Sequence, residues 1–497
     1  MKLCKNFYTK SDILKHIKGK SVHMTIANHA NTLSYVVYKK ILIDIYNRKY
    51  TPNEKMPTLY QFCALYNVGR NTIRSALSRL EKEGIVSSEK GRNTILLLDI
   101  DNRVYQETYI DELVAHRNFY DSVYDTLSIM MPDLIIISLH KATKQQQIDI
   151  LNSVRESLNE NCATYRIYNL TEIFLCLVSY LNNPIVSDFL DNLMRYKFYP
   201  IERIEEVTNM RIQIDNEATS IFNYLKEFFT EPNELALKAE IQTLYKYGKE
   251  LTNTYIDHFH RKNNIQTHIN FEWYSNRKQE YLYSQIVLDI LGKVIEGVYT
   301  TGDKIPSIEH LAKQYDVSFR TSRKAIDVLQ SYAVIETING KGSYIKVENY
   351  KQNKKAFNLI LNDNIQYYHY FIEFMKFVLH SLIPIYLPIL GDHDYNEMVL
   401  YAKNMKVFRF EPIRDKVFGL SNPIFKLINQ EYEKATIWNM FVPMMLEVNS
   451  LGYDFAAQRA DILKALEIKD IDAIIASVDL MSDVSMEITQ YFMQNKD

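Results

Sequence analysis

Glycine is scarce in this chain, with 13 of 497 residues, or under 3%, against about 7% in average proteins. This scarcity argues against glycine-rich phosphate loops and many-turned β folds, and it favours helices. The sequence also lacks a nucleophile elbow, a P-loop, an HExxH motif and a dinucleotide-binding fingerprint. We therefore expect a protein that is not an enzyme and that needs no cofactor.

Cysteine is equally sparse. The four cysteines, at positions 4, 63, 162 and 176, lie far apart and form no CxxC pair, which predicts free thiols in a reducing compartment. No N-terminal stretch combines a basic region with an apolar one. The longest apolar runs, near Leu134–Leu139 and Leu382–Leu390, fall short of the roughly 20 residues that cross a bilayer. These absences predict a cytoplasmic protein with no membrane partner.

The charge of the chain is unevenly distributed. Residues 1–98 hold 17 Lys and Arg against 6 Asp and Glu, whereas residues 281–348 hold 8 of each. Since the total is −2, the rest of the chain carries −13. A basic head on an acidic body is typical of a nucleic-acid reader joined to a regulatory body. The lysine-rich extension 1–31 is open to two interpretations, a DNA-contacting arm or a solubilising tail.

One pattern occurs twice, at a constant spacing of 249 residues. Without a gap, "YTPNEKMPTLYQFCALYNVGRNTIRSALSRLEKEGIV" (50–86) aligns with "YTTGDKIPSIEHLAKQYDVSFRTSRKAIDVLQSYAVI" (299–335). The identical pairs are Tyr50/Tyr299, Lys55/Lys304, Pro57/Pro306, Tyr66/Tyr315, Val68/Val317, Thr72/Thr321, Arg74/Arg323, Ala76/Ala325 and Leu80/Leu329. A repeat this long indicates two copies of one domain, and 497 residues are enough for several domains.

Each copy predicts the same order of elements. A first helix, 35–48 or 283–296, shows apolar residues at helical spacing and is followed by a short extended segment. A second helix opens at Thr58 or Ser307, whose hydroxyls can cap it, and Thr58 with Gln61 fits a capping box. After a tight turn comes a third helix, 70–83 or 319–332, and then two short strands around a glycine wing at 91–93 or 340–342. This order is that of a winged helix-turn-helix domain.

The third helix of each copy begins with residues suited to reading DNA. The N-terminal part of a recognition helix faces base edges in the major groove, where arginine pairs with guanine and asparagine with adenine. The opposite face, with Val68, Ala76, Leu77 and Leu80 or Val317, Ala325, Ile326 and Leu329, should be core. The predicted DNA-binding residues are Thr58, Arg70, Asn71, Thr72, Arg74 and Arg92 in the first copy and Ser307, Ser318, Arg320, Thr321, Arg323, Lys324 and Lys341 in the second.

These motifs resemble the GntR family of bacterial transcriptional regulators, known by "G-D-x-L-P-S", "V-S-R-x-T-V-R-x-A-L" and a glycine wing. The second copy matches with "YSQIVLDILGKVIEGVYTTGDKIPS" (283–307) and "GKGSYIKV" (340–347), the first with "VGRNTIRSALSRLEKEGIV" (68–86). Two departures stand out. The family has Glu-Arg after Pro-Ser, where this chain has Leu59-Tyr60 and Ile308-Glu309, and Phe319 stands where the first copy has Arg70. Together with its zero net charge, these make the second copy the weaker candidate for tight DNA binding; it reads a different half-site or serves dimerisation and positioning.

The resemblance implies a double-stranded DNA operator, an effector-binding domain beside each winged helix, and a small-molecule effector. Two fused units then form a single-chain pseudo-dimer on an asymmetric operator, or associate further as a homodimer. An aminotransferase-like fusion, found with some winged helices of this kind, disagrees with the glycine-poor bodies. The mainly helical bodies favour the helical effector class of the family, which sometimes binds metal. Asp111, His116, His258 and His260, or His369, His380 and His393, show no spacing that fits a metal site.

We predict a mainly α fold with small β wings and five segments. These are a basic extension (1–31), winged helix one (32–98), helical body one (99–280), winged helix two (281–348) and helical body two (349–497). Weak echoes between the bodies, "NFYDSVYDTLSIMMP" (118–132) with "YFIEFMKFVLHSLIP" (370–384) and "LNNPI" (181–185) with "LSNPI" (420–424), suggest a tandem duplication of the whole unit.

The sequence predicts a sequence-specific transcriptional regulator, a repressor on the grounds of the resemblance, whose operator affinity a ligand in the helical bodies modulates. One alternative is a replication initiator or DNA-organising protein, because tandem winged helices also occur in plasmid initiators. A second alternative keeps the winged helices as protein-interaction modules. The arginines at the start of both recognition helices and the basic head argue against the second.

Overall fold

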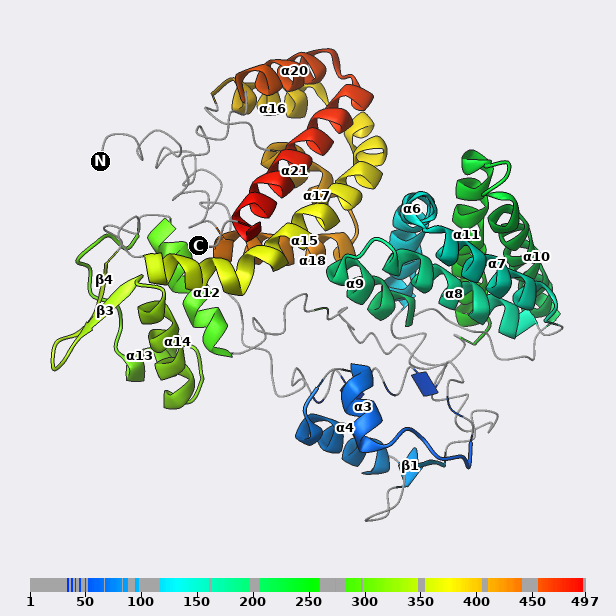
Figure 1. The fold of residues 1–497 in the computed structure, drawn as a ribbon, viewed down its shortest axis with the longest axis horizontal. Coiled ribbons are helices and arrows are strands. Elements are labelled where there is room, and N and C mark those ends of the chain that lie inside the picture. Colours follow the sequence, from blue (N-terminus) through cyan, green and yellow to red (C-terminus); the bar gives the residue numbers. More distant parts are fainter. Residues whose placement is uncertain are drawn as a thin grey trace. The chain divides into compact units, whose positions relative to one another are not determined.

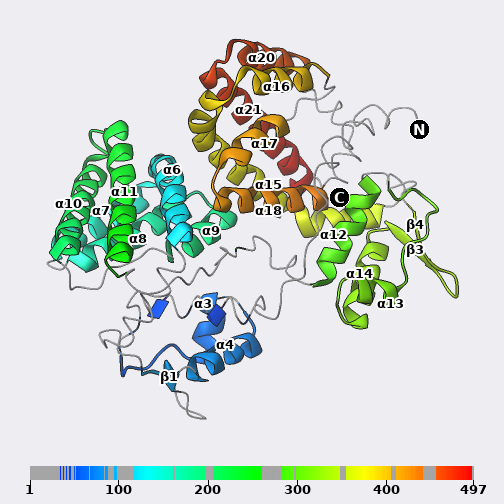
Figure 2. The same cartoon turned by 180° about the vertical axis from the view of Figure 1, so that it is seen from behind.

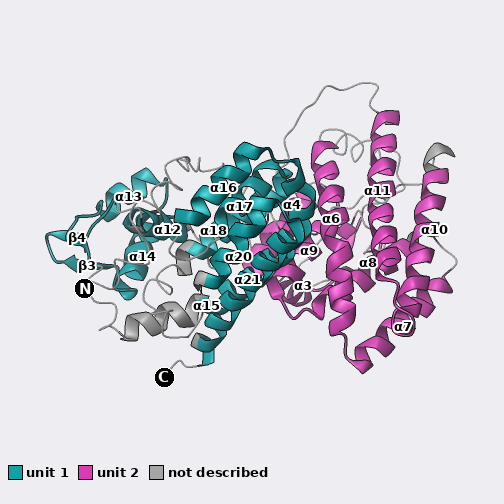
Figure 3. Cartoon of the chain, turned by 90° about the horizontal axis from the view of Figure 1, so that it is seen from above, with its two compact units in different colours: residues 1–26, 274–497 teal, residues 27–273 magenta. Residues whose placement is uncertain are grey.

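The computed structural model describes residues 34, 37–38, 41, 44–45, 50, 52–66, 68–82, 84–87, 94–97, 117–160, 163–195, 205–259, 273, 282–295, 298–346, 354–404, 410–439 and 455–494. The N-terminal extension, Asp111, His116, His260 and the tip of the first wing, including Arg92, lie outside these residues. The chain divides into two compact units, one of residues 27–273 and one of residues 274–497 together with 1–26 (Figure 3). Each unit contains one winged helix and one helical body.

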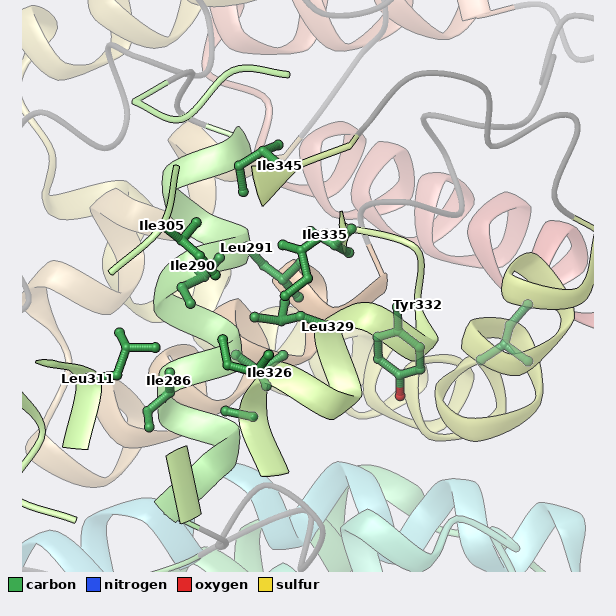
Figure 4. Close-up of a cluster of buried hydrophobic side chains, with 14 residues drawn as sticks. Ile286, Ile290, Leu291, Ile305, Leu311, Ile326, Leu329, Tyr332, Ile335 and Ile345 are labelled. Atoms are coloured by element: carbon green, nitrogen blue, oxygen red, sulfur yellow. The ribbon is translucent and has the colours of Figure 1, made fainter. Parts of the chain in front are cut away.

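Winged helix two contains three helices and a hairpin. The helices are α12 (Leu282–Ile295), α13 (Ile308–Gln314) and α14 (Phe319–Ser331), and the strands are β3 (Ile335–Ile338) and β4 (Gly342–Ile345). Its core is aliphatic: Ile286, Ile290 and Leu291 of α12 meet Leu311 of α13, Ile326 and Leu329 of α14, and Ile335 and Ile345 of the hairpin (Figure 4). Burying this one face of each element fixes which face of α14 remains in solvent.

Winged helix one follows the same plan in its described parts. It contains α3 (Leu59–Tyr66), α4 (Arg70–Lys82), β1 (Val86–Ser87) and β2 (Ile95–Leu96). Figure 1 labels α3, α4 and β1. The residues described within the predicted first helix are all helical. Among them, Val37, Tyr38, Ile41 and Ile45 are buried in one core with residues of α3 and α4. The two recognition helices therefore begin where the sequence predicts, and α14 ends one residue earlier than expected.

In each wing, a residue of the extended segment before the second helix pairs with the hairpin, which the sequence did not reveal. β1 and β2 are antiparallel, as are β3 and β4. The extended segment before the second helix adds an isolated antiparallel bridge to each hairpin, Lys55 with Ile95 and Lys304 with Tyr344. The backbone turns that precede the bridges also correspond: Asn53 and Gly302, aligned in the repeat, both have positive φ, 64° and 93°. The wing is thereby fixed to the body of its own domain.

Helical body one consists, in its described residues, of six α-helices. They are α6 (Arg117–Lys141), α7 (Lys144–Leu158), α8 (Ala163–Ser179), α9 (Pro184–Arg195), α10 (Glu205–Glu227) and α11 (Glu234–Phe259). α6 lies along α11, and α10 packs beside α11 (Figure 2). At the α6–α11 contact, a Cβ on Gly248 would lie 2.6 Å from the ring of Tyr124. The lack of a side chain at Gly248 is what allows this approach.

Helical body two also has six α-helices among its described residues, with a short 3₁₀ turn after the first. They are α15 (Lys354–Tyr386), η4 (Leu387–Ile389), α16 (Asp392–Asn404), α17 (Glu411–Leu420), α18 (Pro423–Asn439), α20 (Phe455–Ile468) and α21 (Ile471–Gln494). α15 lies along α21. Ile365 of α15 is fully buried in the core of winged helix two, and α12 packs against α18. The mainly helical class predicted for both bodies is confirmed.

Among the residues that the structure describes, two helices are long and apolar enough to cross a membrane by length and composition alone. They are α6 and the segment Ile365–Ile389, each with a mean hydropathy of 1.4, and 67% and 56% of their windows are buried inside the protein. Polar residues interrupt both and pair within the bodies: Asp125 of α6 with Lys249 at 2.8 Å, and Lys376 of α15 with Asp483 at 2.6 Å. Uninterrupted apolar runs in the sequence gave no sign of helices this long. Their packing is that of core helices of helical bodies.

Candidate nucleic-acid interface

Capping side chains mark the beginning of α3, α13 and α14. The amide of Thr58 donates to Gln61 Oε1 at 2.8 Å and the amide of Gln61 donates to Thr58 Oγ1 at 3.3 Å, the reciprocal bonds of the predicted capping box. In winged helix two, Ser307 Oγ accepts from the amide of His310 at 3.2 Å and Ser318 Oγ from that of Thr321 at 3.1 Å. These bonds give the predicted Thr58, Ser307 and Ser318 a structural role, alongside the DNA contacts proposed for them.

The same backbone hydrogen bond closes the turn between the second and third helices in both copies. The amide of Val68 donates to the carbonyl of Cys63 at 3.1 Å, and that of Val317 to Ala312 at 2.9 Å. Asp316, in the second turn, has φ of 49°, a left-handed conformation that Asp tolerates. The recognition helix is therefore held at a defined angle to the helix before it, as a helix-turn-helix reader requires.

A hydrogen bond between the first two helices supports each turn. Tyr66 Oη donates to Asp44 Oδ2 at 2.7 Å, and Tyr315 Oη donates to Asp289 Oδ2. Burial first, and then the charge of the carboxylate, raise the pKa of Tyr66 far above its ordinary value. Burial and then hydrogen bonding to Asp289 raise the pKa of Tyr315 in the same way. Both tyrosines thus remain proton donors over the physiological range.

The third helices separate core from solvent as predicted. Ala76, Leu77 and Leu80 are buried in the first copy. Ala325, Ile326 and Leu329 are buried in the second, while Val68 and Val317 are partly buried against the same cores. The remaining predicted readers lie on the other face: Arg70, Asn71, Arg74, Arg320, Arg323 and Lys324 are exposed, and Thr72 and Thr321 are half-buried. The geometry leaves these side chains accessible to a DNA groove.

Sequence reasoning missed part of this solvent face. Ser75 and Ser78 of α4 and Asp327 of α14 are exposed on the same face as the predicted readers. Each follows a predicted reader by four residues, a spacing that places two side chains on one face of a helix and could have identified all three. Tyr60, at the start of α3, is 73% exposed. Its aligned partner Glu309 is also exposed.

The wing of the second copy presents one predicted residue. Lys341 is exposed at the hairpin tip beside Gly340, whose φ of 75° confirms the expected left-handed glycine. Lys304 lies under the hairpin, with its ammonium 5.9 Å from the centre of the Tyr344 ring. Arg92, predicted for the first wing, lies outside the described residues.

Side chains that could hold a metal ion do not gather in the part of the chain that the structure describes. No group of three or more His, Cys, Asp or Glu with suitable placement occurs among these residues. His369 bonds Thr489 at 2.7 Å, and His380 bonds Asp479 at 3.0 Å. Both histidines thus join α15 to α21 within helical body two.

Comparison with known proteins identifies the repeated domain. The family model described as "Bacterial regulatory proteins, gntR family" matches residues 33–96 and 282–345. The "Probable fructoselysine utilization operon transcriptional repressor" of Escherichia coli O157:H7 is 38% identical over 194 residues, 39% of this chain and 66% of that protein. The "Uncharacterized HTH-type transcriptional regulator YurK" of Bacillus subtilis is 36% identical over 70 residues, 14% of this chain and 29% of its own length.

A solved structure, "Streptococcus agalactiae GntR", aligns over 44% of this chain and 99% of its own, with 14% identity and a TM-score of 0.20. The chain spans 29%, 66% and 30% of the first three curated relatives it matches. Both winged helices of the chain therefore match the GntR family model. The predicted family and the fold class, mainly α with small β wings, are both confirmed.

Proposed function

We propose that this protein is a sequence-specific DNA-binding transcriptional regulator that represses its target genes from an operator with two half-sites. Each recognition helix enters a major groove, with α4 on one half-site and α14 on the other. The predicted residues on the two helices contact bases, and the capping hydroxyls and wing lysine contact phosphates. The site of action is the cytoplasm, and the protein has no enzymatic role.

The carrying observation is the duplicated, solvent-facing recognition helix. In both copies a backbone hydrogen bond closes the turn before the helix, one face of the helix is buried in the domain core, and the arginines lie on the other face. Folding of a winged helix does not require arginines at these exposed positions. Binding to a DNA groove, which is lined by phosphates and guanine edges, does require basic side chains there. Four curated relatives have the word repressor in their names, which supports repression over activation.

A small-molecule effector in the helical bodies would modulate operator affinity. The support is in helical body two, where Ile365 of α15 is buried in the core of winged helix two and α12 packs against α18. A ligand that favours one packing of α15 or α18 thereby favours one placement of α12 and its recognition helix. Such a ligand changes DNA affinity only by its different affinity for the two arrangements.

The test is sequencing of genomic fragments retained by the full-length protein at near-physiological salt. Two half-sites at fixed spacing upstream of genes are the expected result. Clusters at a replication origin would favour an initiator instead, and no sequence enrichment with or without cellular small molecules would overturn the proposal. The affinity for the same fragments is then measured for two double variants, Arg70→Ala/Arg74→Ala and Arg320→Ala/Arg323→Ala. Each is expected to bind at least tenfold more weakly, since one bidentate pair gives about 1–3 kcal/mol. Lys426→Ala, an exposed lysine of α18, is the control for charge alone.

A further inference from the structure

The two recognition helices differ most where they face solvent. The exposed strip of α4 consists of Arg70, Asn71, Arg74, Ser75 and Ser78, and that of α14 of Phe319, Arg320, Arg323, Lys324 and Asp327. In the repeat these positions align one to one, and only Arg74 and Arg323 are identical. The buried faces, in contrast, keep Ala and Leu at matched positions. The copies thus share a scaffold and differ in the surface that would meet a base pair.

Phe319 is the apolar residue of this strip, and binding to the DNA backbone does not explain it. It is the first residue of α14, directly after the capping Ser318, and 48% of its surface is exposed. It lies outside the buried and partly buried members of the domain core. Arg323, four residues later, shares its face of the helix. Single exposed apolar residues are common on proteins, but this one lies at the leading end of a basic recognition strip.

On the basis of the proposed function, we propose that Phe319 is the specificity-determining residue of winged helix two and packs against the C5-methyl group of a thymine. In the major groove, thymine alone presents a methyl group, and an aromatic side chain is one of the apolar partners it accepts. Arg70, the aligned residue of winged helix one, instead pairs with guanine O6 and N7. The flanking Arg320, Arg323 and Lys324 contact neighbouring bases, and their positive charge favours the approach of α14 to the DNA.

This assignment makes the operator asymmetric in a specific way. The half-site under α4 carries a guanine at the base pair where the half-site under α14 carries a thymine. Asp327, which aligns with Ser78, adds an acceptor that fits the amino group of cytosine and repels phosphate. A single chain therefore reads two unlike half-sites with one fold.

The experiment starts from a random duplex library selected with the full-length protein. In the selected duplex, each thymine is replaced in turn by deoxyuridine, which removes only the methyl group. We expect one position, in one half-site, at which this replacement weakens binding about fourfold, the effect of one buried methyl group. Phe319→Arg should abolish that sensitivity and shift the preference of the same base pair to guanine. Arg70→Phe, the matched swap in winged helix one, should create a methyl-sensitive position in the other half-site.

The outcomes separate this inference from the proposed function. Selection of two half-sites with no uracil-sensitive position, or a sensitivity that Phe319→Arg leaves unchanged, overturns the inference and leaves a DNA-binding regulator. Selection of a single half-site read by α4 also overturns it. Absence of any selected sequence overturns both. Unchanged hydrogen exchange of residues 308–346 in Phe319→Arg shows that the variant retains its fold. A loss of methyl sensitivity is then due to the missing contact and not to unfolding of the domain.

Discussion

Replacing Tyr66 by phenylalanine tests the hydrogen bond that supports the helix-turn-helix of winged helix one. The change removes one hydroxyl, whose oxygen lies 2.7 Å from Asp44 Oδ2. Asp44 is 2% exposed, so water cannot readily replace the lost donor. Hydrogen bonds to a charged group contribute about 1.5–3 kcal/mol. Because Asp44 keeps other interactions, we expect the free energy of opening of this domain to fall by about 2 kcal/mol.

Tyr315→Phe is the matched variant in winged helix two. There the acceptor Asp289 has a side chain that is 37% exposed and an ion pair with Lys293 at 2.7 Å. Solvent and the lysine both compensate for the lost hydroxyl, so the expected loss is below about 1 kcal/mol. The difference between the two variants measures the burial of the acceptor, since the deleted atom is the same.

The assay is hydrogen exchange read by mass spectrometry on the full chain, because a multidomain protein has no single unfolding free energy. Peptides from α3 and α4 report on Tyr66→Phe, and peptides from α13 and α14 on Tyr315→Phe. Equal losses in the two domains, or a larger loss in Tyr315→Phe, would refute the reasoning.

Alkaline pH gives an independent readout of the same bond. The folded pKa of Tyr66 lies above its unfolded value of 10.0, so its contribution to stability is complete below about pH 10 and is lost as the pH rises beyond it. Winged helix one of the natural chain should therefore lose stability towards about pH 11. Tyr66→Phe removes the titrating group, and its stability should fall less steeply over the same interval.

Three further predictions concern other parts of the molecule. Gly248→Ala places a Cβ 2.6 Å from Cε1 of the Tyr124 ring, and it should destabilise helical body one by about 1–3 kcal/mol in urea unfolding. Ala333→Gly should stabilise winged helix two by about 1 kcal/mol in hydrogen exchange, because φ is 54° at this residue and glycine adopts that conformation without strain. Burial, followed by the shared hydrogen bond and charge of Glu240, raises the pKa of Glu217 to about 7. Glu217→Gln should therefore stabilise helical body one, read by hydrogen exchange of α10 and α11, above about pH 7, and should leave its stability unchanged below about pH 4, where the carboxyl is protonated in the folded and the unfolded chain.

Matched positions in the chain control two of these predictions. Gly292 of α12 has no neighbouring atom within 4 Å of the place that a Cβ would take, so Gly292→Ala should stabilise its helix by up to about 1 kcal/mol. Gly84 aligns with Ala333 in the repeat and has φ of 72°, so Gly84→Ala should destabilise winged helix one. If Gly248→Ala leaves stability unchanged, the argument from the Tyr124 contact fails. If the substitutions Gly84→Ala and Ala333→Gly shift stability in the same direction, the argument from positive φ fails.

Local pattern was sufficient to predict the recognition helices and the caps of the helices that precede them. The hydroxyl and glutamine of the capping box act over three residues, and the alternation of buried and exposed positions follows the helical period. The acceptor of the supporting tyrosine could not be predicted in this way. Asp44 aligns with Lys293, and Asp289 aligns with Lys40, so the carboxylate lies one helical turn apart in the two copies. Only the packing of the first helix against the second shows that Asp44 and Asp289 each accept a hydrogen bond from the aligned tyrosine, Tyr66 or Tyr315.

The wings show a second limit of sequence reasoning. The extended segment before Pro57 or Pro306 was expected, but not its pairing, because one isolated bridge leaves no alternating pattern to detect. Likewise, counting uninterrupted apolar runs missed the length of α6 and α15. Their polar residues pair across the body with α11 and α21, which cannot be seen until the partner helices are in place.

The helical bodies support the inference that duplication covered a whole unit of winged helix and body. In each body the fourth residue of the third helix is a largely buried arginine, Arg166 paired with Asp215 and Arg414 paired with Asp415. In each, an asparagine before a proline caps the fourth helix through its Oδ1, with Asn183 and Asn422 each accepting two backbone amides. Chance resemblance of apolar helices does not produce matched polar caps at matched helices. If the bodies descend from one ancestor, then the different partners of the two arginines, like the different exposed strips of α4 and α14, mark where the halves have acquired separate roles.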